Sequence, residues 1–191
     1  MNIAIYIYDD AEVLDFSGPF EVFNTAKRLF NLDWTVFFLA EEEQFVRARG
    51  GMTLLPHFAL GEHPDIDLLI VSGGIHDREQ RNENVISWLK KECPNMERVA
   101  SVCTGAFLLA QAGLLDDRRV VTHWEDCESL KVQFPQLTVV DDQRFVKDES
   151  YYSSAGISAG IDLSLALVEE LAGQECATRT ARQMDYRWIR E

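Results

Sequence analysis

The sequence is poor in several features that would indicate particular classes of protein. None of its apolar runs approaches the ~18–20 residues that a bilayer span requires, and the N-terminus lacks the basic flank and cleavage site of a signal peptide. Positive charge is scarce, since 18 Lys and Arg residues stand against 32 Asp and Glu, giving a formal net charge of −14. Such a field repels phosphate backbones and anionic lipid. We therefore expect a cytoplasmic protein that by itself binds neither nucleic acid nor membranes.

Cysteine is also sparse and scattered. The four cysteines, at positions 93, 103, 127 and 176, include no C-x-x-C pair. Their spacing supports neither a zinc site nor a disulfide framework, so we expect free thiols in a reducing compartment, with no metal and no cofactor. The chain shows no internal repeat and no linker, and its 191 residues suit one domain spanning residues 1–191.

Buried-strand patterns alternate with helical patterns along the chain. The expected strands are 2–8, 34–40, 66–71, 99–102, 119–122 and 137–140, with hairpins near Gly50-Gly51 and at 144–154. The expected helices are 11–30 with Pro19 in its first turn, 84–92, 104–113, 125–134, 161–172 and 176–188 with Met184 and Trp188 inward; residues 56–64 are expected to be irregular. This alternation predicts a largely parallel sheet with helices on both faces.

The stretch from Arg98 to Leu115 predicts a strand, a sharp turn and a helix, with Cys103 at the turn. Small residues flank the cysteine at Ser101 and Gly105, which is the pattern of a nucleophile elbow. Such a turn exposes the sulfur and directs N–H groups of the next helix toward it, which favours the thiolate. The alternative is a small buried hydrophobic residue at a strand end.

Three segments follow predicted strands and would meet at one edge of the sheet. They are the residues after Tyr8, the turn Ser72-Gly73-Gly74, and Cys103. Ligands of open α/β sheets bind at the carboxyl ends of the strands, so this convergence favours a functional Cys103. Glycines after a strand let the backbone approach a ligand, although an ordinary tight turn explains them equally well.

Five motifs occur together in the order LDFSGPFEVF (14–23), DLLIVSGG (67–74), SVCTGAFLLAQAGLL (101–115), VTHW (121–124) and SAGISAGIDLSL (154–165). Because of these motifs and their order, the chain resembles the ThiJ/PfpI superfamily. Within that superfamily it is most similar to the isonitrile hydratase branch and to the sensor domains of AraC-type regulators. The resemblance extends from Ile3 to Trp188. It implies a flavodoxin-like three-layer α/β/α sandwich with a mostly parallel central sheet, usually assembled as a homodimer.

The resemblance also implies roles for individual residues. Cys103 would be the elbow nucleophile, and Asp15 occupies the position where the family has an acidic residue beside the sulfur. Thr104 follows the nucleophile where the protease-like branch has a histidine, which disfavours a peptidase. The regulators carry a helix-turn-helix region after this domain, whereas the present sequence ends at Glu191, which disfavours a transcription factor.

These features predict a cysteine-dependent enzyme that acts on a small molecule, namely an isonitrile hydratase-like lyase. Cys103 would attack the terminal carbon of an isonitrile, and water would open the resulting thioimidate to a formamide. Backbone N–H groups of Gly74 and Thr104, beside Gly73, would bind developing negative charge. Asp15 would transfer protons, with burial raising its pKa above ~3.9, unless it is only a helix cap.

Other predictions concern the surroundings of the sulfur. His123 follows a strand and could approach the site, or it could be a structural histidine beside Trp124. Thr104 could hydrogen-bond the intermediate or simply pack. Phe16, Trp124 and Tyr151 are expected to form the pocket wall together with a partner subunit.

Two alternative functions stay open at this point. The first is a ligand or oxidant sensor whose thiolate is oxidised to a sulfinate. The second is glyoxalase or deglycase-like action on reactive carbonyls, which needs the same cysteine and acid.

Overall fold

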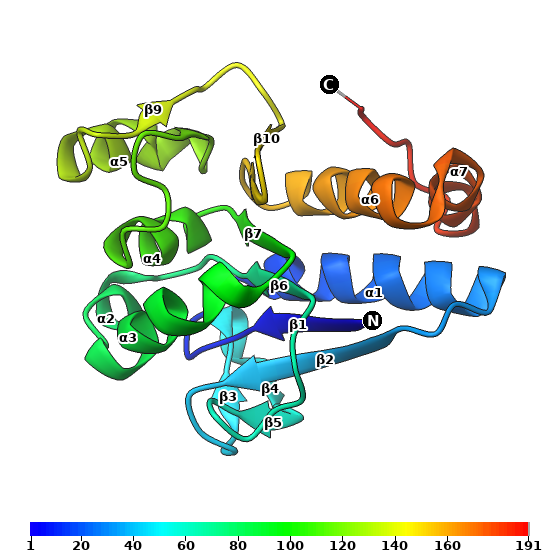
Figure 1. The fold of residues 1–191 in the computed structure, drawn as a ribbon, viewed down its shortest axis with the longest axis horizontal. Coiled ribbons are helices and arrows are strands. Elements are labelled where there is room, and N and C mark those ends of the chain that lie inside the picture. Colours follow the sequence, from blue (N-terminus) through cyan, green and yellow to red (C-terminus); the bar gives the residue numbers. More distant parts are fainter. Residues whose placement is uncertain (191) are drawn as a thin grey trace.

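A seven-stranded sheet forms the middle of the molecule, and β10 is the one strand in it that pairs antiparallel to its neighbour (Figure 1). The computed structural model describes residues 1–190. The strand order is β10-β11-β7-β6-β1-β2-β5. The bounds are β1 Asn2–Tyr6, β2 Thr35–Ala40, β5 Phe58–Ala59, β6 Leu68–Val71, β7 Arg98–Val102, β10 Phe145–Asp148 and β11 Tyr151–Ser154. The inner strands are apolar because helices cover both of their faces.

Helices cover the two faces of this sheet. Figure 1 shows α1, α6 and α7 lying together on one side, and α2, α3 and α4 on the other. The bounds are α1 Val13–Phe30, α2 Asp77–Gln80, α3 Glu83–Glu92, α4 Gly105–Gln111, α5 Cys127–Gln133, α6 Ala159–Ala172 and α7 Gln174–Gln183. The predicted flavodoxin-like α/β/α arrangement with a mostly parallel sheet is therefore confirmed.

Two pairs of short strands lie outside the main sheet. β3 (Val46–Arg47) and β4 (Thr53–Leu54) form the antiparallel hairpin that Gly50 and Gly51 predicted. The strands predicted at 119–122 and 137–140 shrink to β8 (Arg119–Val120) and β9 (Thr138–Val139), which pair in parallel with each other. They form a separate two-stranded sheet rather than extending the alternation of the main one.

Two local predictions near the N-terminal half are wrong. Residues 56–64 contain β5, which pairs with β2 at the edge of the sheet. Pro19 is the seventh residue of α1 and not part of its first turn. Because proline has no N–H, the carbonyl of Asp15 lacks the donor that the fourth following residue normally supplies in a helix.

The predicted C-terminal helix is too long. α7 ends at Gln183, and Asp185 has a positive φ of 50° that interrupts the helix. Trp188 therefore follows in an extended tail, and its Nε1 donates to the Asp162 carbonyl at 3.2 Å. The buried Asp162 carboxylate also accepts from the Ile189 N–H at 2.8 Å, so α6 holds this tail in place.

No helix among residues 1–190 is both long enough and apolar enough to cross a membrane.

Candidate active site

The carboxyl ends of three adjacent strands bring the predicted site residues together. Tyr6 of β1 lies opposite Val71 of β6, and Val71 lies opposite Ser101 of β7. Two positions beyond this row come Tyr8, Gly73 and Cys103. The predicted convergence of these three segments at one edge of the sheet is confirmed.

Backbone contacts between segments 10–12 and 73–75 position Asp15. The Glu12 N–H donates to the Gly73 carbonyl at 2.8 Å, and α1 begins directly afterwards. Asp15 is the third residue of α1 and is completely buried, and its Oδ2 accepts a hydrogen bond from the Gly73 N–H at 3.1 Å. The N-cap residue is Glu12, so the interpretation of Asp15 as a helix cap is wrong.

Cys103 has the backbone of a nucleophile elbow. Its φ of 55° is left-handed, a conformation that costs energy for a residue with a side chain. Its N–H donates to the Ser154 carbonyl at 3.1 Å, and its carbonyl accepts from the Thr122 hydroxyl at 2.8 Å. A Cβ at Gly105 would collide with the Val71 carbonyl oxygen, which explains the small residue in the motif.

Gly73 marks the point where the predicted nucleophile and the predicted acid meet. A Cβ built on Gly73 would lie 2.6 Å from the Thr104 nitrogen, 2.8 Å from Asp15 Oδ2 and 2.8 Å from Cys103 Cβ. Cys103 and Thr104 follow β7, Gly73 follows β6, and Asp15 lies in the first turn of α1. They surround a space that only a hydrogen atom of glycine can occupy without displacing them.

Burial controls the protonation of both groups. Burial first, and then the nearby Asp15 charge, raise the pKa of the Cys103 thiol to about 12, although the Thr104 and Ile157 N–H groups act in the opposite direction. Burial, followed by the charge of Glu12, raises the pKa of Asp15 from 3.8 to about 7. The predicted thiolate is therefore wrong, whereas the raised Asp15 pKa is confirmed. At neutral pH, a neutral thiol lies beside a carboxyl group that can both accept and return a proton.

The Thr104 hydroxyl bonds to the backbone of Gly74. It donates to the Gly74 carbonyl at 2.9 Å and accepts from the Gly74 N–H at 2.8 Å. The Gly73 N–H is likewise donated to Asp15. Neither glycine N–H is free to bind an oxyanion, so this part of the prediction is wrong. The Thr104 N–H, which faces the sulfur, is the remaining candidate donor.

The other predicted pocket residues lie in different environments. Phe16 is 1% exposed and packs edge-on against Phe38 of β2 at 5.7 Å between ring centroids, so it belongs to the core and not to a pocket wall. The half-buried His123 packs its ring over Gly156, and its Nδ1 lies 3.5 Å from Asp126 Oδ2. His123 therefore borders the segment that covers the sulfur.

Trp124 and Tyr151 do not enclose the site. Trp124 is 74% exposed. Tyr151 begins β11 opposite Val99, at the amino end of β7, and Arg118 lies over its ring at 4.7 Å. The prediction that Tyr151 lines the pocket is wrong because it lies at the opposite edge of the sheet from Cys103.

Sequence reasoning missed the residues that cover the sulfur. Cys103 is 6% exposed, and the Ile157 N–H is directed at its sulfur from the turn before α6. Ile157 has a positive φ of 26°, which fits a crowded turn. The small-residue run SSAGISAG at 153–160 was the available signal, although it does not reveal which strand end it covers.

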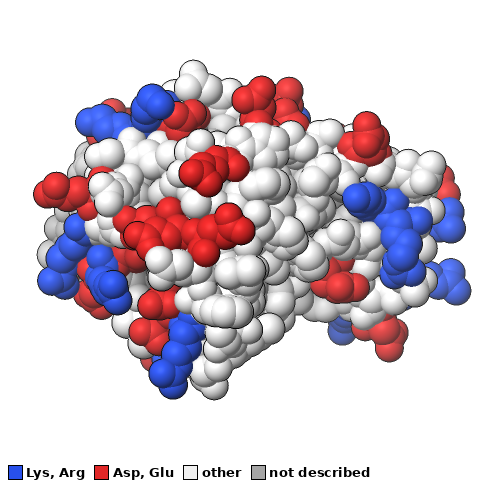
Figure 2. Space-filling model, turned by 90° about the horizontal axis from the view of Figure 1, so that it is seen from below, with Lys and Arg blue, Asp and Glu red and all other residues white. Residues whose placement is uncertain are grey.

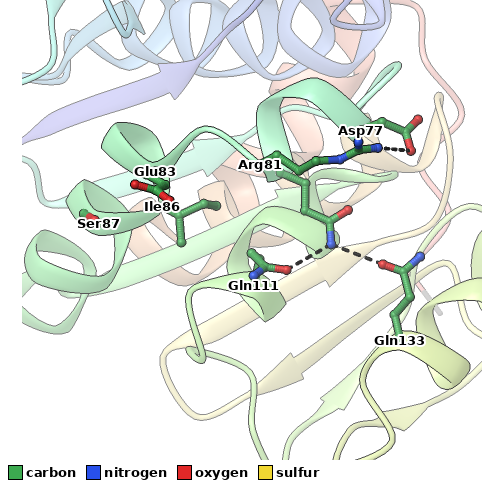
Figure 3. Close-up of a pocket in the computed structure, with 8 residues that line it drawn as sticks. Asp77, Arg81, Glu83, Ile86, Ser87, Gln111 and Gln133 are labelled. Atoms are coloured by element: carbon green, nitrogen blue, oxygen red, sulfur yellow. Dashed lines mark hydrogen bonds and ion pairs between the residues drawn. The ribbon is translucent and has the colours of Figure 1, made fainter.

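A cavity of about 650 Å³ lies elsewhere, on the side of α2 and α3 (Figure 3). The Gln80 amide in its wall donates to Gln111 and Gln133, each at 3.2 Å, and Arg81 pairs with Asp77 at 3.7 Å. Its wall contains amides, charged groups and one serine but no cysteine, so we assign the candidate active site to Cys103 and Asp15.

Replacing Gly73 by alanine should lower the free energy of unfolding by about 3 kcal/mol, because the new methyl group overpacks the space between Asp15 and Cys103. Urea denaturation measures this effect. Gly61→Ala is the matched control, since Gly61 has a φ of 82° and nothing within 4 Å of its Cβ position, so it should lose only about 1 kcal/mol to backbone strain. Equal losses in the two variants would contradict the crowding at Gly73.

A buried cysteine on a left-handed turn, facing a carboxyl group at the carboxyl edge of a flavodoxin-like sheet, defines a class of α/β proteins with a nucleophile elbow. Residues 1–170 match the DJ-1/PfpI family. The chain belongs to this family, which confirms the resemblance to ThiJ/PfpI proteins.

Individual relatives differ in function. The chain is 28% identical to isonitrile hydratase from Pseudomonas putida over 188 residues, which are 97% of this chain and 78% of that protein. It is 33% identical over 174 residues to the HTH-type transcriptional regulator CdhR from Pseudomonas aeruginosa, covering 90% of this chain and 51% of the regulator. A solved ThiJ/PfpI family protein from Pseudomonas syringae has a TM-score of 0.87 at 24% identity, over 97% of this chain and 74% of that one. The chain thus spans about half the length of the regulator.

Proposed function

We propose that this protein is a cysteine-dependent enzyme that hydrates an isonitrile to an N-substituted formamide. The observation that carries the proposal is the approach of the Asp15 carboxylate and the Cys103 Cβ to one point, each 2.8 Å from the Cβ position of Gly73. The similarity to isonitrile hydratase over 97% of the chain supports the same choice of substrate.

The first step adds the thiol across the terminal carbon of the isonitrile. Asp15 accepts the proton of Cys103, the sulfur bonds to the terminal carbon, and Asp15 returns the proton to that same carbon. One S–H bond breaks, while one C–S and one C–H bond form, giving a thioimidate. An acid with a pKa of about 7 suits this role, because at neutral pH it can both accept and donate.

The second step hydrolyses the thioimidate. Water adds to the carbon and gives a proton to Asp15, which passes it to the nitrogen. The C–S bond then breaks, the thiol recovers its proton, and the N-substituted formamide leaves. The N–H of Thr104, directed at the sulfur, stabilises the negative charge that develops there as the bond breaks.

A small-molecule sensor is the second candidate, because the regulator CdhR is 33% identical. The neutral thiol argues against the oxidant-sensing form of this function. Peroxide reacts with thiolates, and burial raises the pKa of Cys103 to about 12. Intact mass measured after mild peroxide treatment tests the oxidant-sensing form, since an oxidant sensor gains two oxygens at Cys103 and an enzyme of the proposed type does not.

The purified protein incubated with cyclohexyl isonitrile should form N-cyclohexylformamide in a catalytic amount, followed by mass spectrometry. Methylglyoxal is the comparison substrate, and lactate from it would indicate a glyoxalase instead. Without turnover of any alkyl isonitrile, the hydratase proposal fails.

A further inference from the structure

A second cavity, of about 240 Å³, lies beside the candidate active site at the carboxyl ends of β1 and β2. Tyr6, at the end of β1, and Tyr8, two residues further along, line it, and the segment after β2 and the helix α2 complete its wall. At ~30 Å³ for each water in the liquid, it has room for about eight water molecules or a small organic molecule.

Its wall is strongly acidic. The carboxylates of Asp9, Glu41, Glu42 and Glu79 line it, against the single guanidinium of Arg78. Within residues 1–190, none of these five side chains forms an ion pair shorter than 4.0 Å. The Glu41 carboxylate instead accepts hydrogen bonds from neutral groups, the side-chain amides of Asn82 and Asn84. The face seen in Figure 2 carries a continuous patch of acidic side chains.

Glu79 is the unusual member of this group. Its side chain is 8% exposed, and the Tyr6 hydroxyl donates to its Oε1. Its Oε2 has no hydrogen-bond partner in the described part of the chain. This atom is not fully buried, so it opens into the cavity that Glu79 lines. The side chain of Tyr8 lines the same cavity, but its hydroxyl is fully buried and lies near the Thr104 side chain. A buried carboxylate normally has a cationic partner, because desolvating its charge alone is costly.

The missing partner has identifiable chemistry. The excess of carboxylates excludes an anion. No group of three or more potential metal ligands occurs among residues 1–190, which disfavours a metal ion. An ammonium group fits, because its N–H bonds can donate to Glu79 Oε2, and aromatic rings, which attract cations, also line the cavity. Arg78 is exposed, and although its charge lowers the pKa of Glu79, burial outweighs it and raises that pKa above its ordinary value.

We propose that this cavity binds the primary ammonium group of a small alkylamine, in contact with Glu79. The site is distinct from Cys103 and does not depend on the hydratase proposal, so binding can be tested without turnover. Because the two sites meet at Tyr8, whose pKa is raised by burial and by the charges of Asp15 and Glu79, an amine bound here lies next to the candidate active site.

The experiment is calorimetric titration with n-butylammonium chloride and with butan-1-ol, its neutral counterpart of similar shape. Butylammonium should bind at least ~10-fold more tightly than the alcohol, because only the ammonium group can form a charge-assisted hydrogen bond to the partly buried Glu79 carboxylate. NMR shifts caused by butylammonium should concentrate at residues 41–46 and 78–82. Equal affinity for both compounds, absence of saturable binding, or a preference for Mg²⁺ at the same residues would each overturn the proposal.

Glu79→Gln keeps an acceptor for Tyr6 and removes the charge, and it should weaken butylammonium binding by about tenfold. Glu42→Gln, which changes an exposed acid at the rim of the cavity, should weaken it by about twofold. Glu43→Gln is the matched control, because Glu43 is an exposed acid in the same segment that does not line the cavity. If Glu43→Gln weakened binding as much as the other two, the effect would be general electrostatic attraction and not a site.

Discussion

Replacing Cys103 by alanine should lower kcat/KM for an alkyl isonitrile by at least ~10³-fold, because no other group can form the covalent bond to its carbon. The protein should still fold. The wild-type residue already has a left-handed φ of 55°, so alanine adds no new backbone strain. Formamide production by the variant and by wild type, measured at equal concentrations of folded protein, gives the ratio.

Cys93→Ala is the matched control for this experiment. Cys93 is also buried, burial likewise raises its pKa to about 12, and it follows α3 in a different part of the fold. Its variant should keep full activity. Retention of activity in Cys103→Ala would remove the assignment of the nucleophile whatever the substrate is.

Asp15→Asn should lower kcat by about 10³-fold and change its pH dependence. The wild-type rate should rise with pH through about 7, where Asp15 loses its proton and becomes able to accept that of the thiol. Asparagine has nearly the same shape but neither accepts nor returns a proton. A pH–rate profile that kept its rise near 7 in Asp15→Asn would assign that ionisation to another group.

The same substitution should stabilise the fold. The pKa of Asp15 is 3.8 as an ordinary carboxyl and about 7 in the folded protein, so between these values the folded state holds more protons than the unfolded state. Stability therefore falls as pH rises through that window, by on the order of 4 kcal/mol at 1.36 kcal/mol for each pH unit. Asp15→Asn should remove this cost and be more stable than wild type at pH 8 but not at pH 4.

Urea denaturation of the two proteins at both pH values tests this expectation. Asp33→Asn, which changes an exposed acid, should show no such gain. A variant that is more stable but inactive would identify Asp15 as a residue kept for chemistry at the expense of the fold.

Most of the main sheet could be predicted because its inner strands are buried on both faces and leave continuous apolar runs, as in β1 and β6. The elbow at Cys103 was also visible, since crowding at Gly105 demands a small residue there. Short edge strands leave no such signal. β5 contains two residues and was predicted as irregular chain, and the pairing of β8 with β9 depends on the tertiary structure around them.

The protonation state of the site could not be predicted from the elbow alone. The pattern around Cys103 predicts N–H groups near the sulfur, and those of Thr104 and Ile157 are there. It does not predict that a turn more than fifty residues later covers the thiol, and this burial decides the pKa. The hydrogen bonds of Thr104 to Gly74 were equally invisible, because they depend on how two strand ends lie side by side.

The in-register arrangement of Tyr8, Gly73 and Cys103 limits how this site can diverge. Neighbouring strands are held ~4.8 Å apart, and each of these residues lies the same number of positions past a paired row. Inserting or deleting one residue between a paired row and any of these three positions would move the affected residue out of the row. The site can therefore change its chemistry by substitution, whereas the lengths of these three connections are as constrained as the core itself.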